Sequence, residues 1–148
     1  MNEEFKREAS KLFEEIQAEF PRLTMQVNTS VPYLDVSVEA LRQPGLDFDV
    51  FMNLQNNDEL HLCAEQFWCS WFPISNASRM QDYREAVVGV LSGRCQIVEF
   101  IRWGRCVGAD LQAPTPEGWK TIAKSRSGLL PIKWFAQARV LRNSPSGK

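Results

Sequence analysis

Two carboxylates, Asp49 and Glu65, are the residues of this sequence best suited to acid–base chemistry, because the strand pattern described below places them opposite each other. Two carboxylates held close together cannot both ionise easily, so one pKa rises and the pair can supply an acid and a base. Like charges opposite each other also destabilise a strand pair. Three other interpretations stay open: solvation of both groups, bridging by Arg102 or Arg105, or pairing with a basic side chain of a partner.

The only histidine, His61, shares the polar face of one predicted strand with Cys63 and Glu65. Same-face neighbours on a strand start roughly 6 to 7 Å apart, because each residue rises about 3.4 Å, so a nucleophile and base pair of Cys63 and His61 is disfavoured. A metal site would need at least one further ligand, which no spacing supplies. We predict no catalytic residue, no metal and no cofactor, and a non-enzymatic function is favoured over an enzymatic one.

Motif searches support this preference. The sequence has no Gly-x-Ser-x-Gly elbow, no phosphate-binding Gly-x-x-x-x-Gly-Lys-Ser/Thr, no Gly-x-Gly-x-x-Gly and no His-Glu-x-x-His. Each of these patterns carries a defined nucleophile, phosphate cradle or zinc ligand pair. The common hydrolase and nucleotide-dependent reactions therefore lose support.

A predicted β-hairpin positions His61 and its neighbours. Apolar and polar residues alternate over 48–54 and over 60–64, and the intervening Asn56, Asn57 and Asp58 tolerate a left-handed turn. A turn of three residues keeps one face apolar, whereas a turn of two would mix the faces. The resulting pairs are Leu54–Leu60, Met52–Leu62 and Val50–Ala64 on the apolar face, and Asn53–His61, Phe51–Cys63 and Asp49–Glu65 on the other.

Two helices are predicted from apolar residues at helical spacing. Asn2 can cap the first and Pro21 ends it. Ser78 followed by Gln81 has the spacing of a capping box for the second, and Gly93 is a C-terminal stop. The helices span about residues 2–20 and 78–92.

Runs of strand character fill much of the remaining chain. The strands are predicted at about 23–27, 34–38, 48–54, 60–72, 95–103, 106–111 and 119–124. The run 95–103 is apolar on both sides, which is typical of a central strand. Residues 114–118 have the composition of a loop, and 131–141 fits a strand and a short helix equally well.

The order of these elements predicts an α+β fold. Connections of hairpin length favour a mostly antiparallel sheet of about six to seven strands, with the two helices packed on one face. A chain of 148 residues is one domain's length, so we expect a single domain over 1–142 and a flexible polar tail over 143–148. Two helices cannot cover both faces of such a sheet, so we expect the opposite face to be open to solvent or to a partner.

Charge is distributed unevenly along the chain, although the net charge is only −1. Residues 1–74 hold 5 basic and 13 acidic side chains, whereas residues 75–148 hold 12 and 5. From Gly118 onward there are 7 basic residues and no acidic one. Either the two halves neutralise each other within the fold, or one of them faces a partner of opposite charge.

The leading functional hypothesis is a non-enzymatic intracellular protein-binding module of the adaptor, chaperone or toxin-neutralising type. It would bind a protein with a basic surface through an acidic sheet face with aromatic edges, formed by Asp35, Glu39, Asp47, Asp49, Phe51, His61 and Glu65. One alternative is a nucleic-acid-associated protein that uses the basic aromatic segment, with Lys120, Lys124, Arg126, Lys133, Trp134 and Arg139. A second alternative is a small-molecule binder or enzyme with a pocket lined by tryptophan, although the five tryptophans also suit the core.

Cellular location follows from cysteines and hydropathy. The four cysteines lie in apolar or strand-like surroundings without Cys-x-x-Cys spacing, so we predict thiols in the core and a reducing, cytoplasmic setting. The N-terminus lacks the apolar core of a secretory signal, and no apolar stretch reaches the roughly 20 residues that span a bilayer. We predict no membrane association, and a homo-oligomer is compatible with the sequence.

Overall fold

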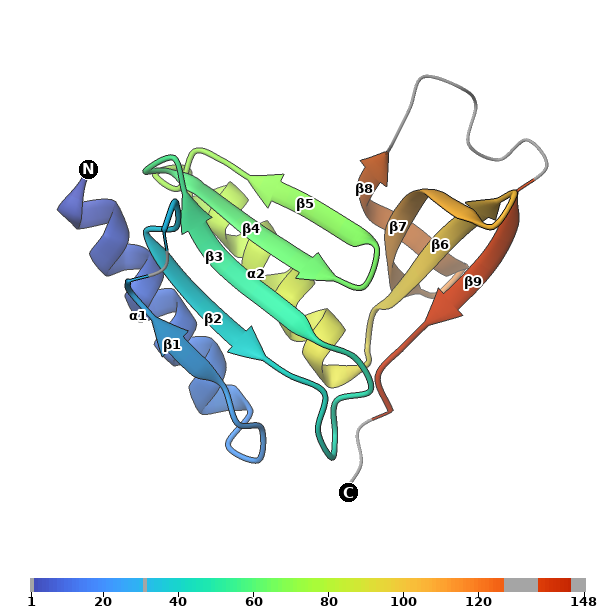
Figure 1. Ribbon diagram of the computed structural model, residues 1–148, viewed down its shortest axis with the longest axis horizontal. Coiled ribbons are helices and arrows are strands. Elements are labelled where there is room, and N and C mark those ends of the chain that lie inside the picture. The colour runs from blue at the N-terminus through green and yellow to red at the C-terminus, as the bar shows by residue number, and fades with distance from the viewer. Residues whose placement is uncertain (1, 31, 127–135, 145–148) are drawn as a thin grey trace.

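The structure, a computed structural model, describes residues 2–30, 32–126 and 136–144 and has the predicted α+β fold. The elements are α1 (Glu3–Glu19), β1 (Gln26–Asn28), β2 (Val36–Ala40), β3 (Val50–Gln55), β4 (Glu59–Ala64), β5 (Phe67–Trp71), α2 (Ala77–Ser92), β6 (Gln96–Arg102), β7 (Arg105–Thr115), β8 (Gly118–Arg126) and β9 (Gln137–Leu141). In these ranges the strands form two antiparallel sheets, ordered β1-β2-β3-β4-β5 and β8-β7-β6-β9 (Figure 1).

The number of strands differs from the sequence prediction. The described residues contain nine strands in two sheets, not six to seven in one. One reason lies in the run 60–72, which is two strands, β4 and β5, joined at Glu65 and Gln66. Glu65 has a φ of 51°, and this left-handed conformation reverses the chain. The alternation of apolar and polar residues shows that a strand is present but not where it folds back.

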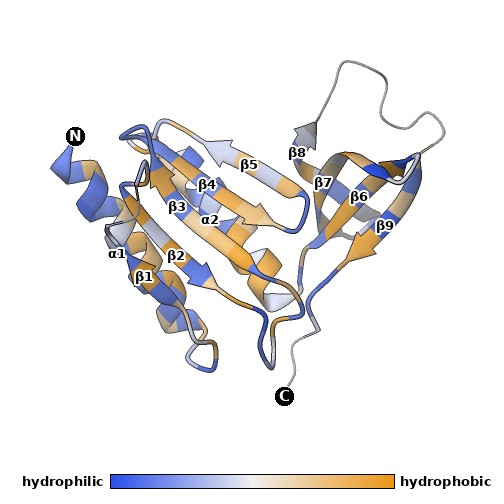
Figure 2. Ribbon diagram, in the orientation of Figure 1, coloured by the Kyte–Doolittle hydropathy of each residue, from blue (hydrophilic) through white to orange (hydrophobic). Residues whose placement is uncertain are grey.

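Both helices cover one face of the five-stranded sheet (Figure 1). Helix α1 contacts β2, and α2 contacts β4 and β5. The contact surface of α1 consists of its buried residues Ala9, Leu12, Phe13 and Ile16. Figure 2 shows that the rest of α1 is mainly hydrophilic. Burial of this apolar stripe is the dominant stabilising term for such a helix.

The helix ends are capped by polar side chains and a glycine. The Asn2 side chain accepts a hydrogen bond from the Glu4 N–H at 3.0 Å, as predicted. Helix α2 begins after Asn76, whose side chain accepts from the N–H of Ser78, so the predicted capping box at Ser78 is wrong. Asparagine caps a helix as well as serine does, and Asn76 comes two residues earlier. Gly93 ends α2 with a φ of 76°, as predicted.

The predicted hairpin between β3 and β4 is confirmed residue by residue from Val50–Ala64 to Gln55–Glu59. Its turn residues Asn56 and Asn57 both have positive φ. The apolar face of the hairpin is buried against the helices, with the side chains of Val50, Met52, Leu54, Leu60 and Leu62 almost inaccessible to solvent. The alternation of apolar and polar residues therefore sets the register of β3 and β4, because a slip of one residue would expose every apolar side chain.

The second sheet packs against β5 through β7 and β8. Strand β6 lies between β7 and β9, which confirms the predicted central strand over 95–103. The predicted loop over 114–118 is mostly strand, because β7 runs to Thr115 and β8 begins at Gly118. Of the ambiguous stretch 131–141, residues 137–141 form strand β9, and 131–135 lie outside the described residues.

The segment after β9 is bound to the loop between β2 and β3 and to α2. Asn143, which the sequence places at the start of a polar tail, is buried, and its side chain donates a hydrogen bond to the Val90 carbonyl at 2.9 Å. Residues 145–148 of that predicted tail lie outside the described residues. The fold therefore extends at least to Ser144. Within the described ranges, no helix combines the length and the apolar character that a membrane span requires.

Candidate functional site

No described helix or strand lies over the face of the five-stranded sheet that points away from the helices (Figure 1). We call it the open sheet face. Strand pairing arranges its side chains in cross-strand rows, because residues directly opposite each other in an antiparallel sheet share a face. The rows are Asn28–Ser37–Asn53–His61–Ser70, Gln26–Glu39–Phe51–Cys63–Trp68, and Gln55–Glu59.

The centre of the open sheet face is less accessible than the sequence predicts. Ser37, Asn53 and His61 are buried, and His61 is only 3% exposed. In the neighbouring row, the ring of Trp68 lies 5.3 Å from the ring of His61, centre to centre. The face therefore has a buried polar centre, next to which Trp68 is half-exposed.

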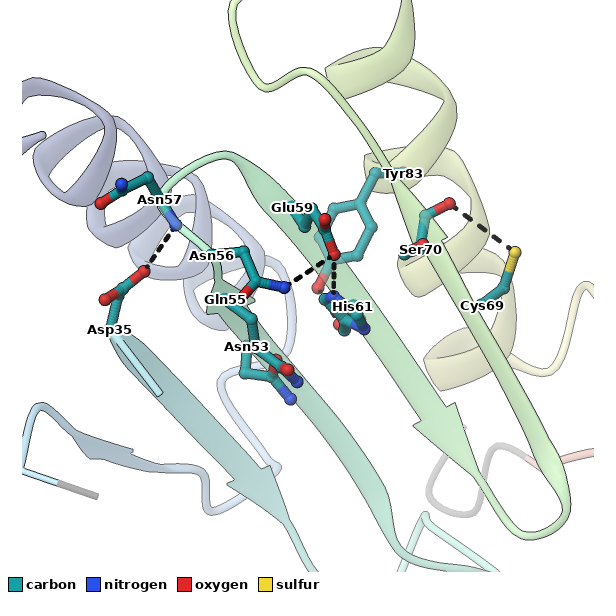
Figure 3. A network of polar contacts seen from close by, with 10 residues as sticks. All are labelled: Asp35, Asn53, Gln55, Asn56, Asn57, Glu59, His61, Cys69, Ser70 and Tyr83. Atoms are coloured by element: carbon teal, nitrogen blue, oxygen red, sulfur yellow. Dashed lines mark hydrogen bonds and ion pairs between the residues drawn. The ribbon is translucent and has the colours of Figure 1, made fainter. Parts of the chain in front are cut away.

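A small hydrogen-bond network surrounds His61 (Figure 3). Its Nε2 atom lies 3.1 Å from Oε2 of Glu59, which also accepts a hydrogen bond from the Asn56 side chain at 3.2 Å. Beside it, the Gln55 amide donates to Oδ1 of Asn53 at 2.8 Å. Because a carboxylate can only accept, Nε2 of His61 carries a proton. In the neutral ring Nδ1 is then an acceptor, and this buried atom has no hydrogen-bond partner.

Tyr83 of α2 holds β4 from the opposite face. Its hydroxyl donates to the backbone carbonyl of His61 at 2.8 Å, and the side chain is fully buried. Burial raises the pKa of Tyr83 well above its ordinary value, so the hydroxyl remains a donor. This contact fixes the backbone beneath His61. Trp68 on the outer surface remains 52% exposed.

Cys63 follows His61 on the same face, but its chemistry does not suit nucleophilic catalysis. Burial raises the pKa of the Cys63 thiol to about 11, so the thiolate is scarce near neutral pH. In the part of the chain that the structure describes, no group of three or more His, Cys, Asp and Glu side chains could hold a metal ion.

Three of the predicted acidic residues serve the fold as hydrogen-bond acceptors for backbone N–H groups. The pairs are Asp35 with Asn57 at 3.1 Å, Asp47 with Ser144 at 2.8 Å, and Asp49 with Arg42 at 2.7 Å. These carboxylates anchor loops at the sheet's ends. Glu39, Phe51 and His61 do lie together on the open sheet face, as the sequence predicts.

The predicted pairing of Asp49 with Glu65 is not formed as a rung of the ladder. Pairing of β3 with β4 ends at Val50 and Ala64, and Glu65 belongs to the turn. Glu65 instead lies close enough to Glu99 of β6 for its charge to raise the pKa of that carboxyl. The acid–base pair suggested by the sequence therefore loses its geometric basis.

The predicted nucleic-acid residues do not converge on one surface. Arg139 shares a row with Glu99, whereas Lys124 shares a row with Asp110, on the other face of the second sheet. Lys120 lines a pocket beside α2. Lys133, Trp134 and the side chain of Arg126 lie outside the described residues. Strand alternation and sheet order thus separate basic residues that are close in sequence.

Sequence reasoning missed Glu59, Trp68 and Glu99. The alternation of β5 could have shown that Trp68 shares a face with Ser70 and so with His61. Glu99 carried a clearer signal, since it is an acidic residue inside an apolar run. Of the four described tryptophans only Trp71 is buried, so the preference for a core role was wrong for the others.

Comparison with known proteins adds no family to this description. No protein-family model, curated protein or solved structure matches the chain.

Proposed function

We propose that this protein is a non-enzymatic protein-binding module that docks a partner with a basic surface on its open sheet face. The observation that carries the proposal is a broad sheet face over which no described helix lies, on which polar and acidic side chains surround a half-exposed tryptophan. Neither helix reaches this face, so a partner can approach it directly.

Charge selects the kind of partner. None of the residues of β1 to β5 is lysine or arginine, whereas Glu39 and Glu59 stand on the open sheet face. Glu65 adds an exposed carboxylate at the end of β4. A surface of one sign attracts a surface of the opposite sign and accelerates the encounter. A protein with exposed lysine and arginine side chains is therefore the complementary partner.

Trp68 supplies the anchor for such a contact. Tryptophan is enriched among the few interface residues that contribute most of the binding energy, and such residues are commonly surrounded by polar groups. Trp68 has that setting, with Cys63 opposite it in the ladder and His61 beneath its ring. Burying its exposed half would remove apolar surface from water.

The proposal can be tested by capturing partners from nuclease-treated extract of the native cells on immobilised protein. The informative variants are Glu39→Lys and Trp68→Ala, which alter the open sheet face. The matched controls are Glu14→Lys on the exposed side of α1 and Trp103→Ala in the turn between β6 and β7, a residue that is 88% exposed. We expect one protein to be retained by the wild type and both controls, and at least about tenfold less by both face variants, a loss of about 1.4 kcal/mol.

The captured protein then allows a kinetic check. Electrostatic steering acts mainly on association, so Glu39→Lys should slow the association rate and weaken its dependence on salt, whereas Trp68→Ala should mainly speed dissociation. Equal retention by face variants and controls would contradict the proposal. So would capture that disappears entirely after nuclease treatment, which would favour a nucleic acid.

A further inference from the structure

A second site lies where the turn between β4 and β5 meets the second sheet. It is a pocket of about 360 Å³, lined by Gln66, Glu99, Ile101, Gly104, Arg105, Cys106 and Arg139. This volume lies within the range of about 300 to 1,000 Å³ that small-molecule sites have. It uses no residue of the open sheet face and is independent of the function proposed above.

Glu99 is the unusual group in this pocket. It stands in the middle of the central strand β6, and only 2% of the residue is exposed. Its Oε1 atom makes no hydrogen bond and forms only a long ion pair, 4.0 Å from Nε of Arg139, among the described residues. Burial raises the pKa of the Glu99 carboxyl, and the neighbouring charge of Glu65 raises it further, while Arg139 lowers it. A buried carboxylate in this state needs a donor that carries positive charge.

The two arginines of the pocket occupy its solvent side. Arg105 is exposed, and the Arg139 side chain is 59% exposed, in contrast to the buried Glu99. Burial therefore separates the inaccessible carboxylate of Glu99 from the two more exposed arginines among the lining residues. A ligand with only positive charge would be repelled by the arginines, and a ligand with only negative charge would be repelled by Glu99.

We propose that this pocket binds a free α-amino acid, with the ligand's ammonium group on Glu99 and its carboxylate on Arg105 and Arg139. An ammonium group offers three hydrogen-bond donors, one of which would satisfy Oε1 of Glu99. Guanidinium groups bind carboxylates through paired, charge-assisted hydrogen bonds. In an α-amino acid both groups are attached to one carbon, which suits a compact pocket. Ile101 adds an apolar contact for the ligand side chain.

The test is a thermal-shift screen of the full-length protein with each of the standard L-α-amino acids, followed by calorimetry on the strongest binder. That amino acid is compared with its decarboxylated amine and its deaminated acid. We expect the amino acid to bind and each half-ligand to bind at least about tenfold more weakly, because each lacks one of the two charge contacts.

Variants locate the site. Glu99→Gln and Arg105→Gln should each weaken binding at least about tenfold, whereas the exposed controls Glu117→Gln and Arg7→Gln should leave it unchanged. Arg105 is exposed, so its variant tests the site even if Glu99→Gln alters folding, which circular dichroism and a thermal melt would reveal. The proposal is overturned if no amino acid binds, if an amine binds as tightly as its amino acid, or if neither variant weakens binding.

Discussion

Asp47 and Asn143 are joined across 96 residues of sequence by a hydrogen bond of 2.8 Å, from the backbone N–H of Asp47 to Oδ1 of Asn143. The contact is reinforced next to it, because the Asp47 carboxylate accepts the N–H of Ser144 at 2.8 Å. On its other side the Asn143 amide donates to Val90 near the end of α2. One buried side chain therefore ties the segment after β9 to the loop between β2 and β3 and to α2.

Replacing Asn143 by Ala should lower the free energy of unfolding by about 1 to 3 kcal/mol, because it leaves the N–H of Asp47 and the Val90 carbonyl without this partner. Urea unfolding followed by circular dichroism would measure the change. Ser144→Ala is the matched control, since it keeps the backbone N–H that donates a hydrogen bond to the Asp47 carboxylate. Equal stability of the two variants would show that the tie is unimportant.

Leu62 tests the packing of the helices on the sheet. Its side chain is fully buried beneath them, so Leu62→Ala should cost about 2 to 5 kcal/mol. Leu41→Ala removes the same atoms from a residue that is 48% exposed and should change stability by no more than about 0.5 kcal/mol. Thermal or urea unfolding of both proteins gives the comparison. A small loss for Leu62→Ala would mean that the faces of the hairpin are assigned incorrectly.

Glu99→Gln should change how stability depends on pH. Because the pKa of Glu99 is raised in the folded protein, the folded state binds the proton more tightly than the unfolded chain does. Stability therefore falls as pH rises from the ordinary pKa of 4.5 through the raised value, and this decline is absent in the variant. The free energy of unfolding of Glu99→Gln minus that of the wild type should therefore be larger at pH 7 than at pH 4. Urea unfolding at both pH values would check this, and a constant difference would contradict it.

Cys63 should react slowly with thiol reagents. With its pKa raised from 9.0 to about 11, the thiolate fraction near pH 8 is about 100-fold lower than for an unperturbed cysteine. Mass spectrometry of the iodoacetamide-treated folded protein should show correspondingly slow labelling at Cys63. The urea-unfolded chain is the control and should label at the ordinary rate. Equally fast labelling in both states would exclude the raised pKa and reopen a nucleophilic role.

Local sequence patterns were sufficient for the parts of the fold that depend on near neighbours. The pairing of Leu54 with Leu60 follows from the apolar alternation and a turn of three residues, and Gly93 ends a helix because it adopts a left-handed conformation readily. The predicted grouping of Glu39, Phe51 and His61 on one face rests on the same alternation. Each of these features depends only on the alternation of apolar and polar residues along the chain and on the residues of the turns.

Tertiary structure alone decided which distant groups meet. Nothing local to Asn143 distinguishes a buried tie from a frayed tail, because its partners Asp47 and Val90 are distant in sequence. The same holds for Glu99, whose pocket combines residues of β6, β7, β9 and the turn before β5. Side-chain periodicity reports which face a residue is on but not what packs against that face. The sequence by itself therefore determined the register of the β3–β4 hairpin and which of its residues share a face, whereas the number of strands, the second sheet and the Glu99 pocket arise from long-range packing.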